Sequence, residues 1–163
     1  MDHPVIYIMG VSGSGKSTIG KMLSERTGIP FFDGDDFHPK ENIEKMASGQ
    51  PLNDDDRSGW LDSLNNLANK EQANNGAIIA CSALKKSYRD LLKNGLKEKC
   101  FFIFLNGDFE TIKKRIENRG GHFMQSNLLK SQFNTLESPE DALVFDIEKD
   151  PSEIVNDILE KII

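Results

Sequence analysis

The chain has 163 residues, of which 37% are hydrophobic and 28% charged, a size and composition typical of one globular domain rather than a disordered chain. Its formal net charge is −6, with a pI of about 5.1. This balance argues against general affinity for DNA, RNA or anionic membranes, which favour surfaces rich in Lys and Arg, so we expect neither nucleic acid nor membrane as a partner.

Five short apolar runs predict the strands of a sheet: residues 5–9 (VIYIM), 30–32 (PFF), 77–81 (AIIAC), 101–105 (FFIFL) and 142–145 (ALVF). Each run is continuous rather than alternating, as in parallel strands that are covered on both faces. Helical patterns separate them, at residues 16–27, 58–73, 84–94, 108–119 and from Pro151 onward. Strand alternating with helix predicts right-handed crossovers and a doubly wound α/β fold in one domain, residues 1–163.

Neither the N-terminus nor the cysteines suggest export. The first residues carry no basic segment, and their apolar run is too short for a signal peptide or a membrane span. Cys81 and Cys100 lie in or beside apolar runs, which favours buried free thiols over a disulfide. We therefore expect a cytoplasmic protein.

A phosphate-binding loop follows the first predicted strand, because residues 10–18 read GVSGSGKST and fit the pattern G-x-x-x-x-G-K-S. Glycines let backbone N–H groups approach phosphate oxygens, and the helix that follows adds the positive end of its dipole. Lys16 would reach the β- and γ-phosphates, and the Ser17 hydroxyl would ligate Mg²⁺. The residues predicted to bind the nucleotide are Gly10, Ser12, Gly13, Ser14, Gly15, Lys16, Ser17 and Thr18.

Polar side chains crowd the end of the second predicted strand, in FFDGDDFHPKEN (residues 31–42). Ligands of an open α/β sheet lie outside the carboxyl ends of the strands, here beside the phosphate-binding loop. Alternation along an extended chain would place Asp33 and Asp35 on the same side, with Gly34 leaving room between them. One aspartate facing Mg²⁺ could hold it through water, and one facing a hydroxyl could orient it or accept its proton.

Four further side chains suit a polyhydroxylated anion as the acceptor. Arg57 and Arg89 could each form a fork onto a carboxylate, while His38 and Gln132 could reach sugar hydroxyls. A simpler interpretation stays open for the aspartates at 54–56, which could be N-terminal helix acids.

A basic lid is predicted at about residues 119–135. Arg115 and Arg119 lie four residues apart on a predicted helix, hence on one face, and a glycine-hinged loop follows at residues 120–124. A lid arginine near the γ-phosphate would neutralise the charge that develops during phosphoryl transfer. A solvated helix end is the alternative, since arginine also favours the helix dipole there.

Two classes of protein share such a loop at this size, GTP-driven switches and kinases of small substrates. The segment 56–59 fits D-x-x-G, and Asn69-Lys70 begins N-K-x-D, but position 72 is Gln and neither segment follows an apolar strand. The residues therefore favour a kinase of a small polar metabolite and leave open which metabolite it is. The alternative class is a non-catalytic nucleotide-binding switch.

Longer motifs resemble the thermoresistant-type gluconokinases, P-loop kinases that convert D-gluconate and ATP to 6-phospho-D-gluconate. The matching stretches are GVSGSGKST, DGDDFHPKENIEKMASGQPLNDDDRSGWL, ACSALKKSYRDLL, GHFM and LLKSQFNTLESP, so the resemblance runs from Ile6 to about Asp157. The second block is far more specific than the phosphate-binding loop. Shikimate and adenylate kinases share the architecture but differ across that block.

The resemblance implies a cytoplasmic, frequently dimeric enzyme with a three-layer P-loop NTPase fold, a five-stranded parallel sheet, a small lid and Mg-ATP. It assigns phosphate to residues 13–18, magnesium to Ser17 and Asp33, gluconate to Asp35, His38, Arg57, Arg89 and Gln132, adenine to Arg115 and the lid to Arg119. The implied mechanism is in-line transfer, in which Asp33 or Asp35 orients the 6-hydroxyl while Lys16, Mg²⁺ and Arg119 stabilise the phosphoryl group. One departure is the extra glycine in NRGGHFM, which leaves the rigidity of the lid open.

Overall fold

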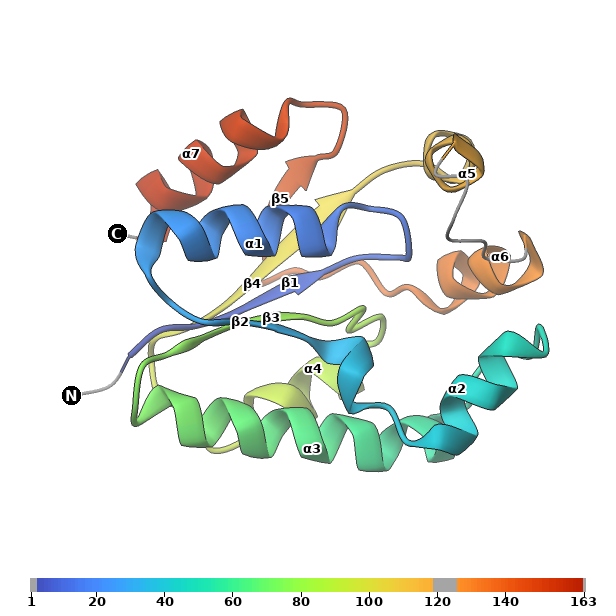
Figure 1. The fold of residues 1–163 in the computed structure, drawn as a ribbon, viewed down its shortest axis with the longest axis horizontal. Coiled ribbons are helices and arrows are strands. Elements are labelled where there is room, and N and C mark those ends of the chain that lie inside the picture. Colours follow the sequence, from blue (N-terminus) through green and yellow to red (C-terminus); the bar gives the residue numbers. More distant parts are fainter. Residues whose placement is uncertain (1–2, 119–125, 163) are drawn as a thin grey trace.

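A parallel sheet forms the centre of the computed structural model, which describes residues 3–118 and 126–162 (Figure 1). Its strands, in spatial order, are β2 (Phe31–Asp33), β3 (Ala77–Ala80), β1 (Val5–Met9), β4 (Cys100–Asn106) and β5 (Leu143–Asp146). Every neighbouring pair is parallel. All five apolar runs are therefore confirmed as strands, and their carboxyl ends meet at one edge of the sheet.

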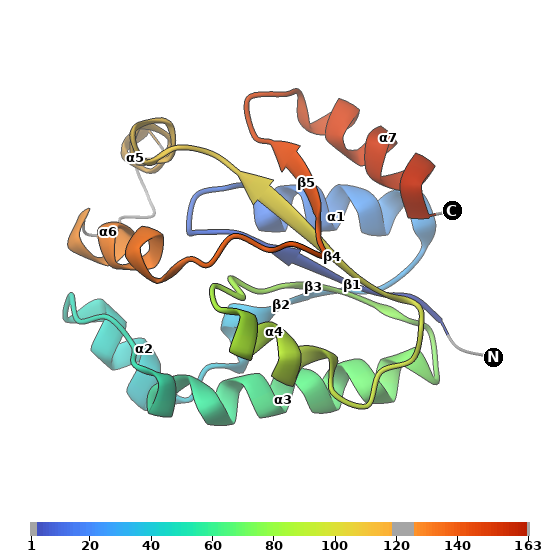
Figure 2. The ribbon, with the colours of Figure 1, turned by 180° about the vertical axis from the view of Figure 1, so that it is seen from behind.

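Helices cover both faces of this sheet, which confirms the predicted three-layer α/β fold. Helices α1 (Lys16–Thr27) and α7 (Pro151–Ile162) lie on one face, and α3 (Asp54–Gln72) and α4 (Lys86–Lys93) on the other (Figures 1 and 2). The remaining helices, α2 (Lys40–Ala47), α5 (Phe109–Asn118) and α6 (Ser126–Thr135), gather near the carboxyl ends of the strands (Figure 1). Among the helices that the structure describes, none has the length and apolar character needed to span a membrane.

Strand β1 lies at the middle of the sheet, and each of its five residues has an exposed fraction of 0%. Complete burial on both faces explains why its sequence shows no polar alternation. The hydroxyl of Tyr7 is satisfied inside this core, because it donates a hydrogen bond to the Leu92 carbonyl of α4 at 2.7 Å. Each buried large apolar side chain stabilises the fold by about 1.5–3 kcal/mol relative to exposure.

Two local structures differ from the sequence predictions. Helix α3 begins at Asp54 rather than at residue 58, because Asn53 and Asp56 form a reciprocal capping box with hydrogen bonds of 2.8 and 2.9 Å. This earlier start places Arg57 in the first turn of α3. After β2, residues Gly34–Phe37 form a 3₁₀ turn, η1, rather than extended chain.

Both cysteines are free thiols, as expected from the sequence. Cys81 is buried at the end of β3, and Cys100 is half-buried at the start of β4. Burial raises the pKa of Cys81 to about 12 and that of Cys100 to about 11. Neither thiol is therefore a nucleophilic thiolate at neutral pH.

Candidate active site

The phosphate-binding loop joins β1 to α1 at the carboxyl edge of the sheet. Gly13 has a φ of +82°, and a Cβ at this position would lie 2.8 Å from Cγ1 of Ile116 on α5, so only glycine fits. The amide N–H groups of Gly13, Gly15 and Ser17 have no acceptor within residues 3–118 and 126–162. Unpaired amides at the start of a helix are the feature that binds phosphate.

Lys16 lies across this loop as the first residue of α1. Its Nζ donates hydrogen bonds to the carbonyl oxygens of Gly10 and Val11, both at 3.0 Å. The first turn of α1 carries no acidic residue, so no carboxylate of that turn competes for the positive helix end. Ser17, half-buried beside Lys16, places its hydroxyl oxygen at the same helix start.

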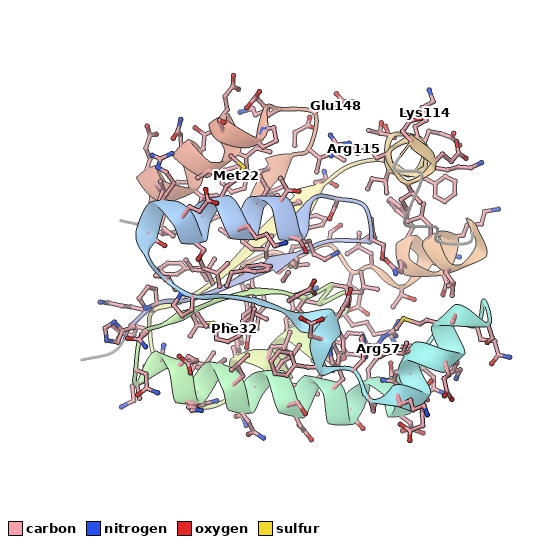
Figure 3. All side chains as sticks on the ribbon, in the orientation of Figure 1. Met22, Phe32, Arg57, Lys114, Arg115 and Glu148 are labelled. Carbon is pink, nitrogen blue, oxygen red and sulfur yellow. The ribbon has the colours of Figure 1, made fainter. Side chains whose placement is uncertain are left out.

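A cavity of about 410 Å³ continues from the loop between α5 and the start of α7. Its lining includes Gly13, Gly15, Thr18, Arg115, Asn118, Ile147, Pro151 and Ile154. Arg115 is held there by a hydrogen bond that it donates to the Ile147 carbonyl, and it lies between α5 and the segment after β5 (Figure 3). A cationic plane beside apolar walls is suited to a nucleotide base. The structure thus places Arg115 next to the phosphate-binding loop, and its contact with adenine stays a prediction.

The polar segment after β2 packs tightly against the end of β3. A Cβ at Gly34 would lie 2.3 Å from the Ala80 carbonyl oxygen, so this close approach requires glycine. The carboxylate of Asp33 accepts a hydrogen bond from the Asp35 amide at 3.0 Å, and Trp60 Nε1 donates to the Gly34 carbonyl at 2.7 Å. The prediction that extended chain places the two aspartates was therefore wrong, because the 3₁₀ turn sets their positions instead.

His38 follows this turn and is almost enclosed, with 4% of its side chain exposed. Its ring stacks on Trp60 with 4.1 Å between the centroids. The Asn42 Nδ2 group donates to the Asp56 carbonyl at 2.8 Å and lies 3.2 Å from His38 Nδ1, which therefore accepts. The ring is then neutral with its proton on Nε2, the atom nearer to Asp35.

Burial and nearby charges together explain the protonation states of His38 and Asp35. Burial, and then the Arg57 cation, lower the pKa of His38 to about 4. Partial burial, and then the neighbouring Asp33 and Asp36 carboxylates, raise the pKa of Asp35, while the nearby Lys16 ammonium opposes that shift. Because 85% of the Asp35 side chain is exposed, solvent still stabilises its charge, and we treat it as a carboxylate at neutral pH.

Arg57 is a buried cation, with only 9% of the residue exposed. Its Nη1 donates a hydrogen bond to the Tyr88 hydroxyl at 2.9 Å. Within the described parts of the chain, no carboxylate oxygen lies within 4.0 Å of its guanidinium. It lines a small cavity of about 20 Å³ with Gln132 and other residues of α6. A buried charge without a counterion is costly, so this arrangement is suited to an anionic ligand.

Gln132 connects α6 to the phosphate-binding loop rather than only facing the acceptor. Its Oε1 accepts a hydrogen bond from the Ser12 amide at 2.7 Å, and its Nε2 donates to Ser12 Oγ at 3.0 Å. The same side chain lines the cavity beside Arg57. The structure therefore brings the predicted residues Ser12, Arg57 and Gln132 together at the boundary between the nucleotide and acceptor sides.

The structure does not bring the predicted Arg89 into this group. Arg89 is 7% exposed, and its guanidinium donates to the backbone carbonyls of Ala83 at 2.7 Å and Glu137 at 3.0 Å. It lines a separate cavity of about 200 Å³ between α4 and residues 137–142. Arg119 and the whole predicted hinge, residues 120–124, lie outside the described residues.

Sequence reasoning missed three residues that shape the acceptor side: Asn42, Trp60 and Tyr88. Asn42 is 3% exposed and sets the tautomer of His38, Trp60 supports both His38 and the 3₁₀ turn, and Tyr88 binds Arg57. Each lies in a helix. Helical periodicity can predict burial of such residues, but it does not say which distant side chain they contact.

Comparisons with known proteins agree with this geometry. The shikimate kinase family model matches residues 12–163. The thermoresistant gluconokinase of Escherichia coli K12 is 46% identical, over 99% of this chain and 94% of its own length. A gluconokinase of Arabidopsis thaliana is 40% identical, over 97% of this chain and 92% of its own.

A solved structure extends this similarity to three dimensions. The crystal structure of a gluconokinase from Sinorhizobium meliloti 1021 shares 41% identity and a TM-score of 0.87, covering 98% of this chain and 91% of that one. The resemblance that the sequence motifs carry is confirmed by these matches over nearly the whole chain. The chain therefore belongs to the gluconokinase family of P-loop kinases.

Proposed function

We propose that the protein transfers the γ-phosphoryl group of ATP to the 6-hydroxyl of D-gluconate, producing ADP and 6-phospho-D-gluconate. The observation that carries the proposal is the buried Arg57, which has no carboxylate partner among the described residues and lies beside the link between α6 and the phosphate-binding loop. An acceptor that brings its own carboxylate would supply the missing anion. Membership of the gluconokinase family indicates which acid that is.

ATP would bind along the phosphate-binding loop, with its phosphates on the amides of residues 13–18 and its base in the cavity beside Arg115. Gly10, Ser12 and Ser14 complete the loop that shapes this site. Lys16, which already lies across the loop, would stabilise the charge of the transferring group. Arg119 is proposed to add a second positive charge from the lid.

Mg²⁺ is the cofactor that these residues fit best. Ser17 and Asp33 offer one hydroxyl and one carboxylate oxygen, the hard donors that Mg²⁺ takes together with phosphates and water. No cluster of three or more His, Cys, Asp or Glu residues that could hold a metal occurs in residues 3–118 and 126–162, so the ion would need those other ligands. The ion would supply a Lewis acid that neutralises phosphate charge.

Gluconate would lie between η1, α3 and α6. Arg57 would bind its carboxylate, while the Nε2–H of neutral His38 and the amide of Gln132 would bind hydroxyls. Arg89 is proposed to support this pocket through the Ala83 carbonyl, in addition to the direct contact that the family resemblance implies. The acceptor would thus be held by one charged contact and several neutral ones.

Transfer would proceed in line. The 6-hydroxyl oxygen forms a bond to the γ-phosphorus as the bond to the β–γ bridging oxygen breaks, leaving ADP. Asp35, an exposed carboxylate near Lys16, would orient the hydroxyl and accept its proton, with Asp33 as the other candidate base. A lid at about residues 119–135 would exclude water, so that the phosphoryl group does not go to hydrolysis.

The cellular setting and the assembly are proposed from the thiols and from the family resemblance. We propose a cytoplasmic enzyme of one domain, which suits its two free thiols. A homodimer is proposed from the family resemblance alone.

The test is ADP release from Mg-ATP with D-gluconate, run beside shikimate, glucose, glycerate, AMP and no acceptor. Strong turnover with gluconate alone is the expected result. Turnover with shikimate would instead favour the activity named by the matching family model, keeping the fold and the phosphate site. Nucleotide binding without acceptor-dependent turnover would refute kinase function and favour a switch.

A further inference from the structure

The position of Arg57 depends on a residue that faces it from another helix. Arg57 and Asp54 are three residues apart on α3, so they are neighbours on the helix surface and could form a direct ion pair. They do not pair within 4.0 Å. Instead the Tyr88 hydroxyl of α4 lies between them, binding the Arg57 guanidinium on one side and the Asp54 carboxylate on the other.

The direction of these two hydrogen bonds is fixed by the chemistry of the three groups. Hydrogen bonds from Tyr88 and from Lys85 lower the pKa of Asp54, so it is an ionised acceptor at neutral pH. Guanidinium has only donors. The single proton of the Tyr88 hydroxyl must therefore point to Asp54, while its oxygen accepts from Arg57 Nη1.

We infer that Tyr88 is a positioning residue that holds Arg57 away from Asp54, so that the guanidinium stays available to the carboxylate of the acceptor. This inference rests on the proposed function. Lys85 Nζ donates to the same Asp54 oxygen at 3.0 Å and gives Asp54 a cationic partner other than Arg57. Tyr88 is 4% exposed, and Arg57 Cζ lies 5.4 Å from its ring centroid, so the ring supports the arginine as well.

Removing only the hydroxyl tests this role. In Tyr88→Phe the ring remains, but Arg57 can turn toward Asp54, and we expect the KM for gluconate to rise about 10-fold. The KM for ATP should stay unchanged and kcat should change far less than the KM for gluconate. The preference for gluconate over glucose should fall as the KM for gluconate rises, because glucose has no carboxylate for Arg57 to bind.

A second substitution separates positioning from simple support. Asp54→Asn in the Tyr88→Phe background removes the charge that would capture Arg57, so the gluconate KM should return toward the wild-type value. Asp54→Asn alone should have little effect, since the amide oxygen of the substituted side chain can still accept from Tyr88. The matched control is Tyr7→Phe, which removes the hydroxyl of the chain's other tyrosine, in the core of the sheet, and should leave both KM values unchanged.

Three outcomes would overturn the inference. Equal gluconate KM values for Tyr88→Phe and wild type would refute it and leave the proposed function intact. A defect in Tyr88→Phe that Asp54→Asn deepens would mean that the hydroxyl only supports the fold. No gluconate turnover by the unaltered protein would overturn the proposed function and this inference together.

Discussion

The phosphate-binding part of the candidate site takes its polar groups from one stretch of chain, residues 10–18, whereas the acceptor side takes them from η1, α2, α3, α4 and α6. The first is built from backbone amides and a helix start, which depend on local conformation. The second is built from side chains such as Trp60 and Gln132, whose hydrogen bonds join residues 26 and 120 positions apart. Phosphate binding is thus a local property of this sequence, and acceptor binding is a tertiary one.

The largest expected effect comes from breaking the nucleotide side. Lys16→Ala should lower kcat at least ~100-fold, because a positioned charge no longer stabilises the transferring phosphoryl group. Gluconate binding, measured by calorimetry, should change little, since Arg57 and His38 stay in place. Lys114→Ala, on the exposed surface of α5, serves as the control (Figure 3). Near-normal turnover of Lys16→Ala would contradict the assigned role.

On the acceptor side, the enclosure of His38 should appear as a dependence of stability on pH. The pKa of His38 is about 4 in the fold, against about 6.5 in an unfolded chain. Between these values the unfolded state binds a proton that the folded state does not, so stability falls as pH drops from about 6.5 to 4, by about 2–3 kcal/mol.

His38→Gln should remove that part of the acid destabilisation, because glutamine does not titrate. Urea unfolding midpoints across this pH range would measure this loss of acid destabilisation. The matched control is His3→Gln, because His3 precedes β1 at the opposite end of the sheet. Parallel pH curves for wild type and His38→Gln would show that His38 is not held neutral by its surroundings.

A substitution at Arg57 should weaken gluconate binding and leave ATP binding unchanged, which distinguishes the acceptor side from the nucleotide side. Arg57→Ala removes the charged fork, and the gluconate KM should rise about 30-fold while the ATP KM stays constant. Arg57→Lys should recover only part of the loss, since an ammonium cannot bind a carboxylate in the same bidentate way. Arg26→Ala, at an exposed position of α1, is the control. Equal losses for both substrates would place Arg57 outside the acceptor pocket.

The smallest expected effect belongs to the residue that joins the two sides. Gln132→Leu removes both hydrogen bonds to Ser12, and we expect about a fivefold rise in the KM for ATP and for gluconate alike. Asn134→Leu on the exposed side of the same helix should change neither value. A change confined to gluconate would mean that the contact with Ser12 does not matter for nucleotide binding.

Local features explain what the sequence could predict. The five strands follow from continuous apolar runs, and the phosphate-binding loop follows from its glycines and the helix after it. Asp108 and Asp150 cap the helices that follow them through contacts of the same local kind, each accepting an amide hydrogen bond at 2.8 Å. These predictions needed only residues that are close together in the chain.

Long-range contacts explain what the sequence could not predict. The 3₁₀ turn after β2 depends on Trp60 and on the fit of Gly34 against Ala80, so strand alternation misplaced the aspartates. The start of α3 was readable in principle, because Asn53 and Asp56 have the spacing of a capping box. The roles of Arg89 and Arg119 in binding and catalysis stay predictions.

The two outer strands of the sheet have a consequence for how copies of this chain could meet. β2 has three residues and β5 has four, and each ends in an aspartate, Asp33 and Asp146. Short, charged edges offer few free backbone groups to a strand from another molecule, which disfavours aggregation through strand addition. The homodimer that we propose would therefore form through helices or loops, and the sheet would end within each subunit.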